Sequence, residues 1–178
     1  NSESFVDNYF RCARFEWQTE FLDRINQAVD HTRWEMTPQT INAYFHPEMN
    51  EIVFPAAILQ APFYDESADP AINFGGIGAI IGHEMTHGYD DQGRKYNANG
   101  NLEDWWTPED AKNFDERAKQ IVDQYSQYTV HGQTVNGELT QGENIADLGG
   151  LTIAYYALQS FLKLCPSVGN IDGYTQNQ

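Results

Sequence analysis

The segment His83-Glu84-Met85-Thr86-His87 places two histidines four residues apart, with a glutamate directly after the first. On a helix, residues four apart lie one turn above each other, so both imidazoles can reach one metal ion. Glu84 would lie about 100° round the helix from His83, beside the open coordination position, where a carboxylate can act as a general base. This spacing is typical of zinc proteases. Two unrelated core or surface histidines on one helix are the alternative.

The residues around this pattern favour a packed helix. Residues 75–82 are rich in glycine and isoleucine, and they predict a glycine-rich turn that enters a tightly packed apolar helix. Gly88 is expected to loosen the helix directly after His87. This context favours the metal-binding interpretation.

A tetrahedral zinc site needs a third protein ligand, and Glu143 is the best candidate. An apolar pattern follows it and predicts a largely buried helix to about Lys163. The apolar positions of this pattern are Ile145, Leu148, Leu151, Ile153, Ala154, Leu158, Phe161 and Leu162. A lone buried carboxylate is costly, so zinc would be a suitable partner. A capping box between Thr140 and Glu143 is an equal alternative on these residues alone.

Several motifs in order resemble the neprilysin family of zinc endopeptidases, peptidase family M13. The similarity runs from about Phe15 to about Tyr174. The matching segments are residues 42–45, 52–56, 73–78, 83–91, 100–102, 105–107 and 142–147. The resemblance implies an α+β, mostly helical zincin (thermolysin-like) catalytic domain with a small β-sheet.

The resemblance also implies the chemistry of the site. It assigns one Zn²⁺ per chain to the ligands His83, His87 and Glu143. It implies endopeptidase hydrolysis of oligopeptides by a zinc-activated water, with Glu84 as the general base. A hydrophobic residue after the scissile bond is the expected preference.

Further residues acquire roles from the same resemblance. Asp90 and Asp147 match carboxylates that orient the ligand histidines, which commonly donate their second N–H to a carboxylate. Asn42 and Ala43 match edge-strand residues that bind the substrate backbone. For both aspartates, a solvated surface charge is the alternative.

A hairpin is expected between residues 40–45 and 51–54, which flank a polar turn. Its free edge could pair with an extended peptide. The resemblance places Ile58, Phe63 and Ile80 on the pocket for the side chain after the scissile bond. Ordinary core packing is an equal alternative for these three residues.

Two more helices are expected outside the site. Apolar residues at helical spacing predict a helix in residues 5–30. Thr107 as the N-cap and Pro108 at the first helical position predict the start of an amphipathic helix. Its apolar face would hold Ala111, Phe114, Ala118, Ile121, Val122 and Tyr125.

Composition limits the classes of protein. A chain of 178 residues is expected to form one domain, residues 1–178. The net charge of −16 argues against nucleic acid as a partner, and no apolar run is long enough for a membrane span. Cys12 and Cys165 define neither a disulfide framework nor a metal site. The lack of Asn-x-Ser/Thr acceptor sites leans towards a bacterial source, and the expected location is extracytoplasmic, with the cytoplasm as the alternative.

The family carries an additional N-terminal helical domain and a C-terminal histidine and arginine that this sequence does not match. The chain is therefore expected to be a catalytic-domain fragment. Peptide is the expected substrate, and the oligomeric state is left open. The first rival function is a zinc-binding fragment without activity of its own. The second is an aminopeptidase, for which Glu48 or Glu51 would have to anchor the substrate amine.

Overall fold

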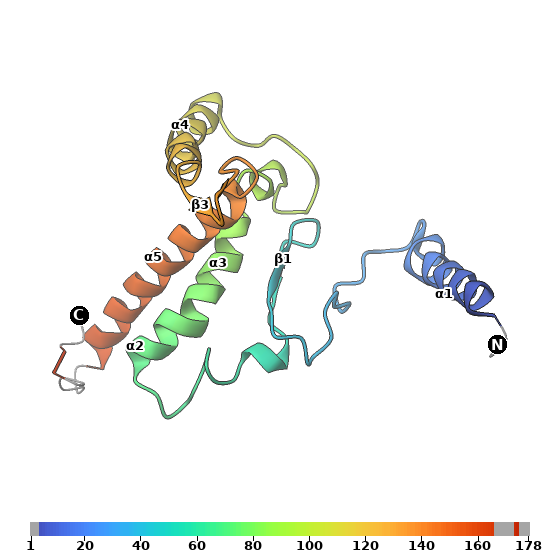
Figure 1. Cartoon of the computed structure of the whole chain (residues 1–178), viewed down its shortest axis with the longest axis horizontal. Coiled ribbons are helices and arrows are strands. Elements are labelled where there is room, and N and C mark those ends of the chain that lie inside the picture. The colour runs from blue at the N-terminus through green and yellow to red at the C-terminus, as the bar shows by residue number, and fades with distance from the viewer. Residues whose placement is uncertain (1–3, 166–172, 175–178) are drawn as a thin grey trace. The chain divides into compact units, whose positions relative to one another are not determined.

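The computed structural model describes residues 4–165 and 173–174 and divides the chain into two compact units, Asn1–Arg33 and Trp34–Gln178. All elements that carry the predicted site lie in the second unit (Figure 1). The mostly helical α+β class with small sheets is confirmed, whereas a single domain over residues 1–178 stays a prediction. No helix among the described residues is long and apolar enough to cross a membrane.

The first unit contains helix α1, Phe5–Glu20, and a short 3₁₀ turn, Leu22–Arg24. The Ser4 hydroxyl caps α1 by accepting a hydrogen bond from the Asp7 backbone N–H at 3.2 Å. The expectation that one helix extends to about residue 30 is wrong, because α1 ends ten residues earlier. Asn26 lies in the left-handed region with φ of 63°, which a continuing α-helix excludes.

The second unit begins with the expected hairpin. Strand β1, Tyr44–His46, pairs antiparallel with strand β2, Glu51–Val53. Asn50 closes the turn with φ of 49°, a conformation that asparagine tolerates better than most residues. The hairpin is confirmed, although both strands are shorter than the predicted segments. A 3₁₀ turn, Ala56–Ile58, follows β2.

A continuous helical run then leads to the two histidines. It consists of α2, Pro70–Asn73, a π-helical segment η3, Phe74–Gly78, and α3, Ala79–His87. The Asp69 carboxylate caps its start by accepting from the Ala71 N–H at 2.8 Å. Residues 75–82 are therefore helical, and the prediction of a glycine-rich turn is wrong. The expectation at Gly88 is confirmed, since it is the C-cap of α3.

The π-helical segment is explained by a contact with the loop that precedes the helical run. The Ile77 N–H donates to the carbonyl of Phe63 at 2.8 Å instead of following the α-helical pattern. A Cβ atom on Gly76 would lie only 2.5 Å from that same carbonyl oxygen. Glycine therefore lets the preceding loop reach the helix, and the bond shifts the local hydrogen-bond register. The core beneath it consists of Ala43, Ile58 and Ile77, with Phe54, Phe63 and Ile80 packed against them.

After α3 the chain makes a 3₁₀ turn, Gly93–Lys95, and then forms α4, Pro108–Tyr125. The Thr107 hydroxyl accepts from the Asp110 N–H at 3.1 Å, so the predicted N-cap is confirmed. The predicted apolar face is also confirmed as the less exposed side of α4, with Ala118 buried. A second hairpin, β3 (Thr129–Val130) and β4 (Gln133–Thr134), was not expected.

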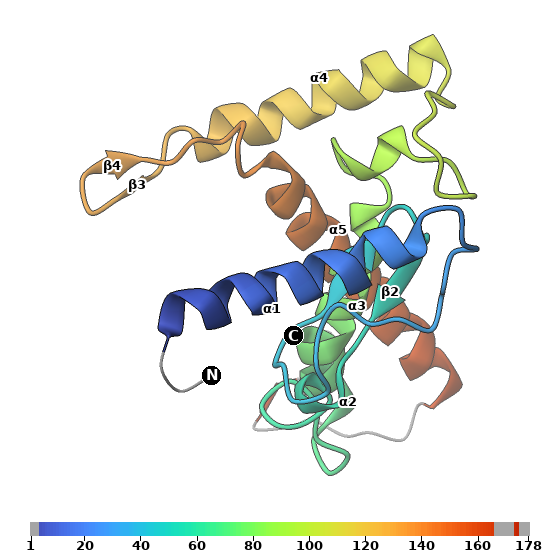
Figure 2. The ribbon, with the colours of Figure 1, turned by 90° about the vertical axis from the view of Figure 1, so that its right-hand side faces the viewer.

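Helix α5, Gln141–Leu164, lies beside α3 in both views (Figures 1 and 2). Its length agrees with the prediction, but its burial does not. Ala154 and Leu158 are buried, whereas Leu148, Leu151 and Ile153 are exposed. Apolar residues of α5 lie on most sides of the helix. In the described structure, mainly those that face α3 are covered. Cys12 and Cys165 are both free and exposed.

Candidate metal centre

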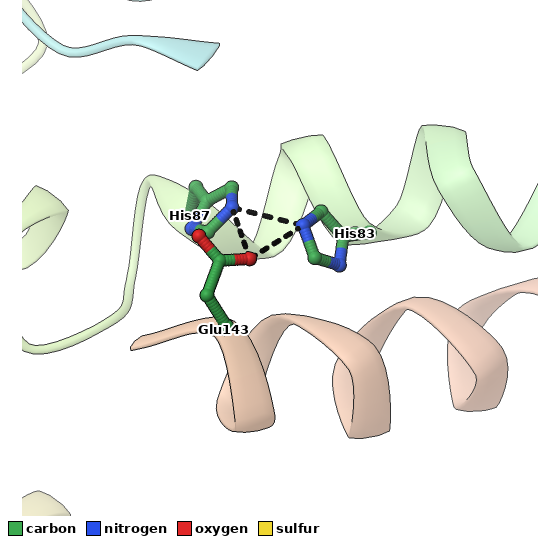
Figure 3. Close-up of side chains that lie close together, drawn as sticks. All are labelled: His83, His87 and Glu143. Atoms are coloured by element: carbon green, nitrogen blue, oxygen red, sulfur yellow. Dashed lines mark hydrogen bonds and ion pairs between the residues drawn. The ribbon is translucent and has the colours of Figure 1, made fainter. Parts of the chain in front are cut away.

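Three side chains from two helices converge on one point. His83 and His87 extend from α3, and Glu143 extends from the first turn of α5 (Figure 3). The two Nε2 atoms lie 3.0 Å apart. The Glu143 Oε2 atom lies 3.2 Å from His83 Nε2 and 3.7 Å from His87 Nε2. These are the only metal-ligating side chains that cluster in this way in the described part of the chain.

The three spacings fit a small tetrahedral metal ion. Zinc binds nitrogen and oxygen at about 2.0–2.1 Å, so two of its tetrahedral ligands lie about 3.3 Å apart. The observed separations of 3.0, 3.2 and 3.7 Å bracket this value. Two histidine nitrogens and a carboxylate oxygen are also a known catalytic zinc ligand set. The residues present therefore fit zinc.

The second nitrogen of each imidazole is held by a carboxylate. His83 Nδ1 lies 2.9 Å from Asp147 Oδ1, and His87 Nδ1 lies 2.7 Å from Asp90 Oδ2. Each Nδ1–H can donate to its carboxylate, which leaves the Nε2 lone pair for the metal side. Two such lone pairs beside the Glu143 carboxylate would repel each other without a cation. This arrangement supports a metal between them.

Asp90 is the better fixed of the two aspartates. It is 5% exposed, and its Oδ1 atom accepts from the backbone N–H of Gln92 at 2.8 Å and of Gly93 at 2.7 Å. Burial acts to raise the pKa of Asp90. The hydrogen bonds from His87 and from these two backbone groups outweigh it and lower the pKa below its usual range. Asp90 is therefore ionised and aligned before a metal binds.

The pKa of His87 is raised above that of a free imidazole. The hydrogen bond to Asp90 is the largest cause, and burial opposes it. The negative charges of Asp90, Glu143 and Glu84 add to the increase. A proton therefore competes with a metal ion for His87 more strongly than it would for a free imidazole.

Glu84 lies close to these groups but is not one of the three side chains that converge. Its side chain is 5% exposed and lines the same cavity as the three ligands. Burial, the largest effect, raises the pKa of Glu84, and the neighbouring His83 and His87 partly oppose it. A backbone hydrogen bond from Phe45 of β1 also stabilises the carboxylate. A buried carboxyl group with a raised pKa is suited to accept and return a proton.

Glu143 lies beside His83 and His87, as predicted, but the predicted cause is wrong. Its role as a metal ligand stays a prediction. The Glu143 side chain is 69% exposed, so the cost of a buried carboxylate does not apply. The capping box is not formed, because no side chain caps α5 and the Thr140 hydroxyl instead accepts from Asn144 at 2.9 Å. The Asp147 side chain is likewise exposed, at 71%.

A cavity of about 460 Å³ opens over His83, His87 and Glu143. Asn42 and Ala43 line it together with β1, as the predicted substrate-binding role requires, although they precede the strand. Its walls also include residues that the sequence analysis did not identify, among them Met36, Phe45 and Gln92. The Asp-Asp-Gln-Gly turn that follows α3 was the available signal for Gln92 and Gly93.

The three predicted pocket residues lie elsewhere. Ile58, Phe63 and Ile80 pack in the apolar core with Ala43 and Ile77, and they do not line the cavity over the metal-binding groups. The described residues thus agree with core packing. A role in binding the substrate side chain stays a prediction.

Comparison with known families and proteins agrees with this geometry. The family described as Peptidase family M13 matches residues 42–178. Human endothelin-converting enzyme 1 is 49% identical over 159 residues, which cover 89% of this chain and 20% of that protein. Neprilysin-3 of Drosophila melanogaster is 47% identical over 156 residues, which cover 88% of this chain and 20% of that protein.

Solved structures give the same result. The zinc metalloprotease Zmp1 of Mycobacterium tuberculosis, in complex with an inhibitor, has a TM-score of 0.82 and 51% identity. The match covers 89% of this chain and 25% of that chain. PepO of Lactobacillus rhamnosis HN001 has a TM-score of 0.70 and 41% identity, over 76% of this chain and 23% of that chain. The chain thus spans about a fifth of the length of the curated relatives it matches.

Proposed function

Because this chain belongs to peptidase family M13, we propose that it carries the zinc centre of an endopeptidase that hydrolyses oligopeptides. The observation that carries the proposal is the convergence of His83, His87 and Glu143 beside the buried carboxyl group of Glu84. Zinc is the expected cofactor, one ion per chain, held by the three converging side chains. When bound, it would act as a Lewis acid and lower the pKa of a coordinated water.

Each residue of the centre contributes a separate task. Asp90 and Asp147 fix the ring orientation of His87 and His83 through the Nδ1 atoms. Glu84 accepts a proton from the attacking water at its carboxylate and later returns it to the leaving amine. Its raised pKa supports this task, because the protonated form must persist between the two transfers.

The hairpin supplies the support for an extended substrate. Strand β1 pairs with β2 on one side, and Asn42, Ala43 and Phe45 line the cavity next to the metal ligands. Backbone and amide groups at such a position can hold a peptide beside the reacting atoms. A preference for a hydrophobic residue after the scissile bond belongs to the same proposal, with Ile58, Phe63 and Ile80 as its candidate residues. An extracytoplasmic location and a bacterial origin also remain proposals.

One observation favours the rival, a zinc-binding fragment without activity of its own. No lysine or arginine is among the described residues that line the cavity. Transition-state charge on the substrate oxygen is commonly stabilised by such preorganised donors, and losing one costs about 10²–10³ in rate. Zinc binding and hydrolysis must therefore be tested separately.

The first test is the metal content of the purified chain, measured by elemental analysis for the wild type and for Glu143→Ala. We expect one zinc per wild-type chain and much weaker retention in the variant. A wild type without tightly bound metal would overturn the zinc assignment.

The second test is hydrolysis of an internally quenched peptide that is blocked at both ends and carries a hydrophobic residue after the expected cut. Internal cleavage that requires zinc would support the endopeptidase. Zinc binding without cleavage would favour the inactive fragment. Cleavage only after the N-terminus is unblocked would favour an aminopeptidase.

A further inference from the structure

The two helices that carry the metal ligands meet through glycines at close range. Gly82 of α3 faces Gly150 of α5, and both are buried. A Cβ atom added to Gly82 would lie 2.6 Å from the Gly150 carbonyl oxygen. Real Cβ atoms essentially never approach backbone so closely, so no larger residue fits without moving one helix.

The contact at Gly150 reaches a metal ligand directly. A Cβ atom there would lie 2.5 Å from the backbone nitrogen of His83 and 2.9 Å from its Cα atom. These are backbone atoms inside α3, which cannot rotate away as a side chain could. The neighbouring Gly149 has a softer contact, because its Cβ atom would lie 2.5 Å from the hydroxyl oxygen of Thr86.

Two of these glycines lie on the same helix as the groups that complete the site. Gly150 follows Glu143 by seven residues, or about two helical turns, with Asp147 between them. His83 is therefore contacted by α5 at two levels. Gly150 touches its backbone, while Glu143 and Asp147 reach its ring nitrogens at 3.2 and 2.9 Å. The distance between the helix backbones consequently determines whether the exposed Glu143 can reach the histidines.

We propose that Gly82, Gly149 and Gly150 are positioning residues for the metal centre. Their missing side chains allow α5 to approach α3 closely enough for Glu143 to complete the ligand set and for Asp147 to orient His83. The inference rests on the zinc-binding part of the proposed function and does not depend on hydrolysis. Glycine destabilises a helix interior relative to alanine, and three glycines at one crossing are accounted for by this close approach.

The chain offers a matched control for every glycine-to-alanine change. Gly75 lies in the same helical run as Gly82, and a Cβ atom added there would meet nothing within 4 Å. Gly75→Ala therefore makes the same chemical change without a steric contact at the helix crossing.

The experiment compares zinc dissociation constants, measured by competition with a chelator, and the visible spectrum of bound Co²⁺, which reports coordination geometry. Gly150→Ala is expected to weaken zinc binding about 10–100-fold, the range for groups that support metal ligands, and to alter the Co²⁺ spectrum. Gly75→Ala is expected to match the wild type in both. Circular dichroism checks that each variant is folded.

A double-variant cycle identifies the cause. If Gly150→Ala acts by withdrawing Glu143, then Glu143→Ala should weaken zinc binding far less in the Gly150→Ala background than in the wild type. Full additivity of the two losses, or wild-type zinc affinity in a folded Gly150→Ala protein, would overturn the proposal.

Gly149 provides a second test if Gly150→Ala does not fold. Gly149→Ala should weaken zinc binding, because its methyl group would meet the Thr86 side chain. Adding Thr86→Ala removes the two closest atoms, Oγ1 at 2.5 Å and Cγ2 at 2.6 Å, and leaves only Cβ at 3.1 Å, so it should restore most of the affinity. Failure of Thr86→Ala to restore it would contradict the proposed spacing role.

The control outcomes separate this inference from the proposed function. Suppose that the wild type binds zinc and that Glu143→Ala weakens zinc binding. If the glycine variants then behave like Gly75→Ala, only the positioning role is wrong. If the wild type binds no zinc, both are wrong.

Discussion

The individual side chains of the site differ in how firmly the protein fixes them. Asp90 is buried and holds two backbone N–H groups in addition to His87. Glu143 and Asp147 are exposed and depend on the position of α5. The half of the site on α3 is therefore organised locally, whereas the half on α5 depends on how the two helices pack.

Glu84→Gln should separate metal binding from proton transfer. Glutamine keeps the size of the side chain but cannot accept the proton, and Glu84 is not among the converging ligands. We expect zinc affinity close to the wild type and peptide hydrolysis reduced at least about 10²–10⁴-fold in an active form of the protein. Met85→Leu, a volume-conserving change of an exposed residue on the same helix, serves as the control. Turnover at the wild-type rate would remove Glu84 from the mechanism.

Zinc binding should weaken as the pH falls through the raised pKa of His87. Above that pKa the imidazole is neutral and free to bind, and below it a proton competes with the metal. Asp90→Asn removes the main cause of the shift, so the loss of affinity should begin at a lower pH than in the wild type.

At alkaline pH, Asp90→Asn should bind zinc about 10–100-fold more weakly, because the imidazole is less well oriented. Zinc dissociation constants measured from acidic to alkaline pH test both effects. Asp123→Asn, which alters an exposed carboxylate on α4, is the control. An unchanged midpoint in Asp90→Asn would contradict the role assigned to this pair.

Among the elements, those that local sequence determines were predicted best. The start of α4 needs a hydroxyl at Thr107 and a proline at its first position, and both were visible in the sequence. The hairpin of β1 and β2 likewise follows from two short strand patterns around a polar turn. Elements whose form depends on a distant contact were predicted less well. The π-helical segment is an example, because its Ile77 N–H donates to the carbonyl of Phe63.

The cap of α4 allows a direct stability test. Thr107→Ala removes the acceptor for the Asp110 N–H and should lower the free energy of unfolding by about 1 kcal/mol. Thr107→Ser keeps the hydroxyl and should behave nearly like the wild type. Urea unfolding monitored by circular dichroism measures both. Equal stability of the alanine and serine variants would show that the cap does not stabilise the fold.

For the whole molecule, two surface properties oppose each other. The net charge of −16 favours separate chains in solution. Large apolar residues are nevertheless exposed on α5, including Leu151 at 60% and Tyr156 at 66%. Exposed apolar patches of this kind promote association, so the state of the chain should depend on how strongly salt screens the charge.

We expect the chain to be more associated at about 1 M salt, where charges are screened beyond about 3 Å, than at about 0.01 M, where the screening length is about 30 Å. Size-exclusion chromatography with light scattering measures the mass at each concentration. Leu151→Gln should reduce the association, whereas Ser160→Gln on the same helix should not. A mass that falls with added salt would show that charge, and not apolar surface, drives association.

The sequence by itself determined the local patterns from which the candidate site was predicted. The spacing of His83 and His87, the glutamate between them and the helix that begins near Glu143 are local patterns, and local patterns determine which side chains share a helical face. The helix caps and the first hairpin are equally local. These features were sufficient to predict two histidine ligands and a candidate base. They left a capping box as an equal alternative for Glu143, and only the resemblance to the family assigned it as the third ligand.

Tertiary structure alone decided how the site is assembled. His83 and Asp147 are 64 residues apart in sequence, and their contact depends on the close approach of α3 and α5 at Gly82 and Gly150. Tertiary packing also buries Glu84, which accepts a backbone hydrogen bond from Phe45 of β1, and leaves Glu143 exposed. Burial and helix spacing result from contacts between segments far apart in the chain, so no pattern within one segment could specify them.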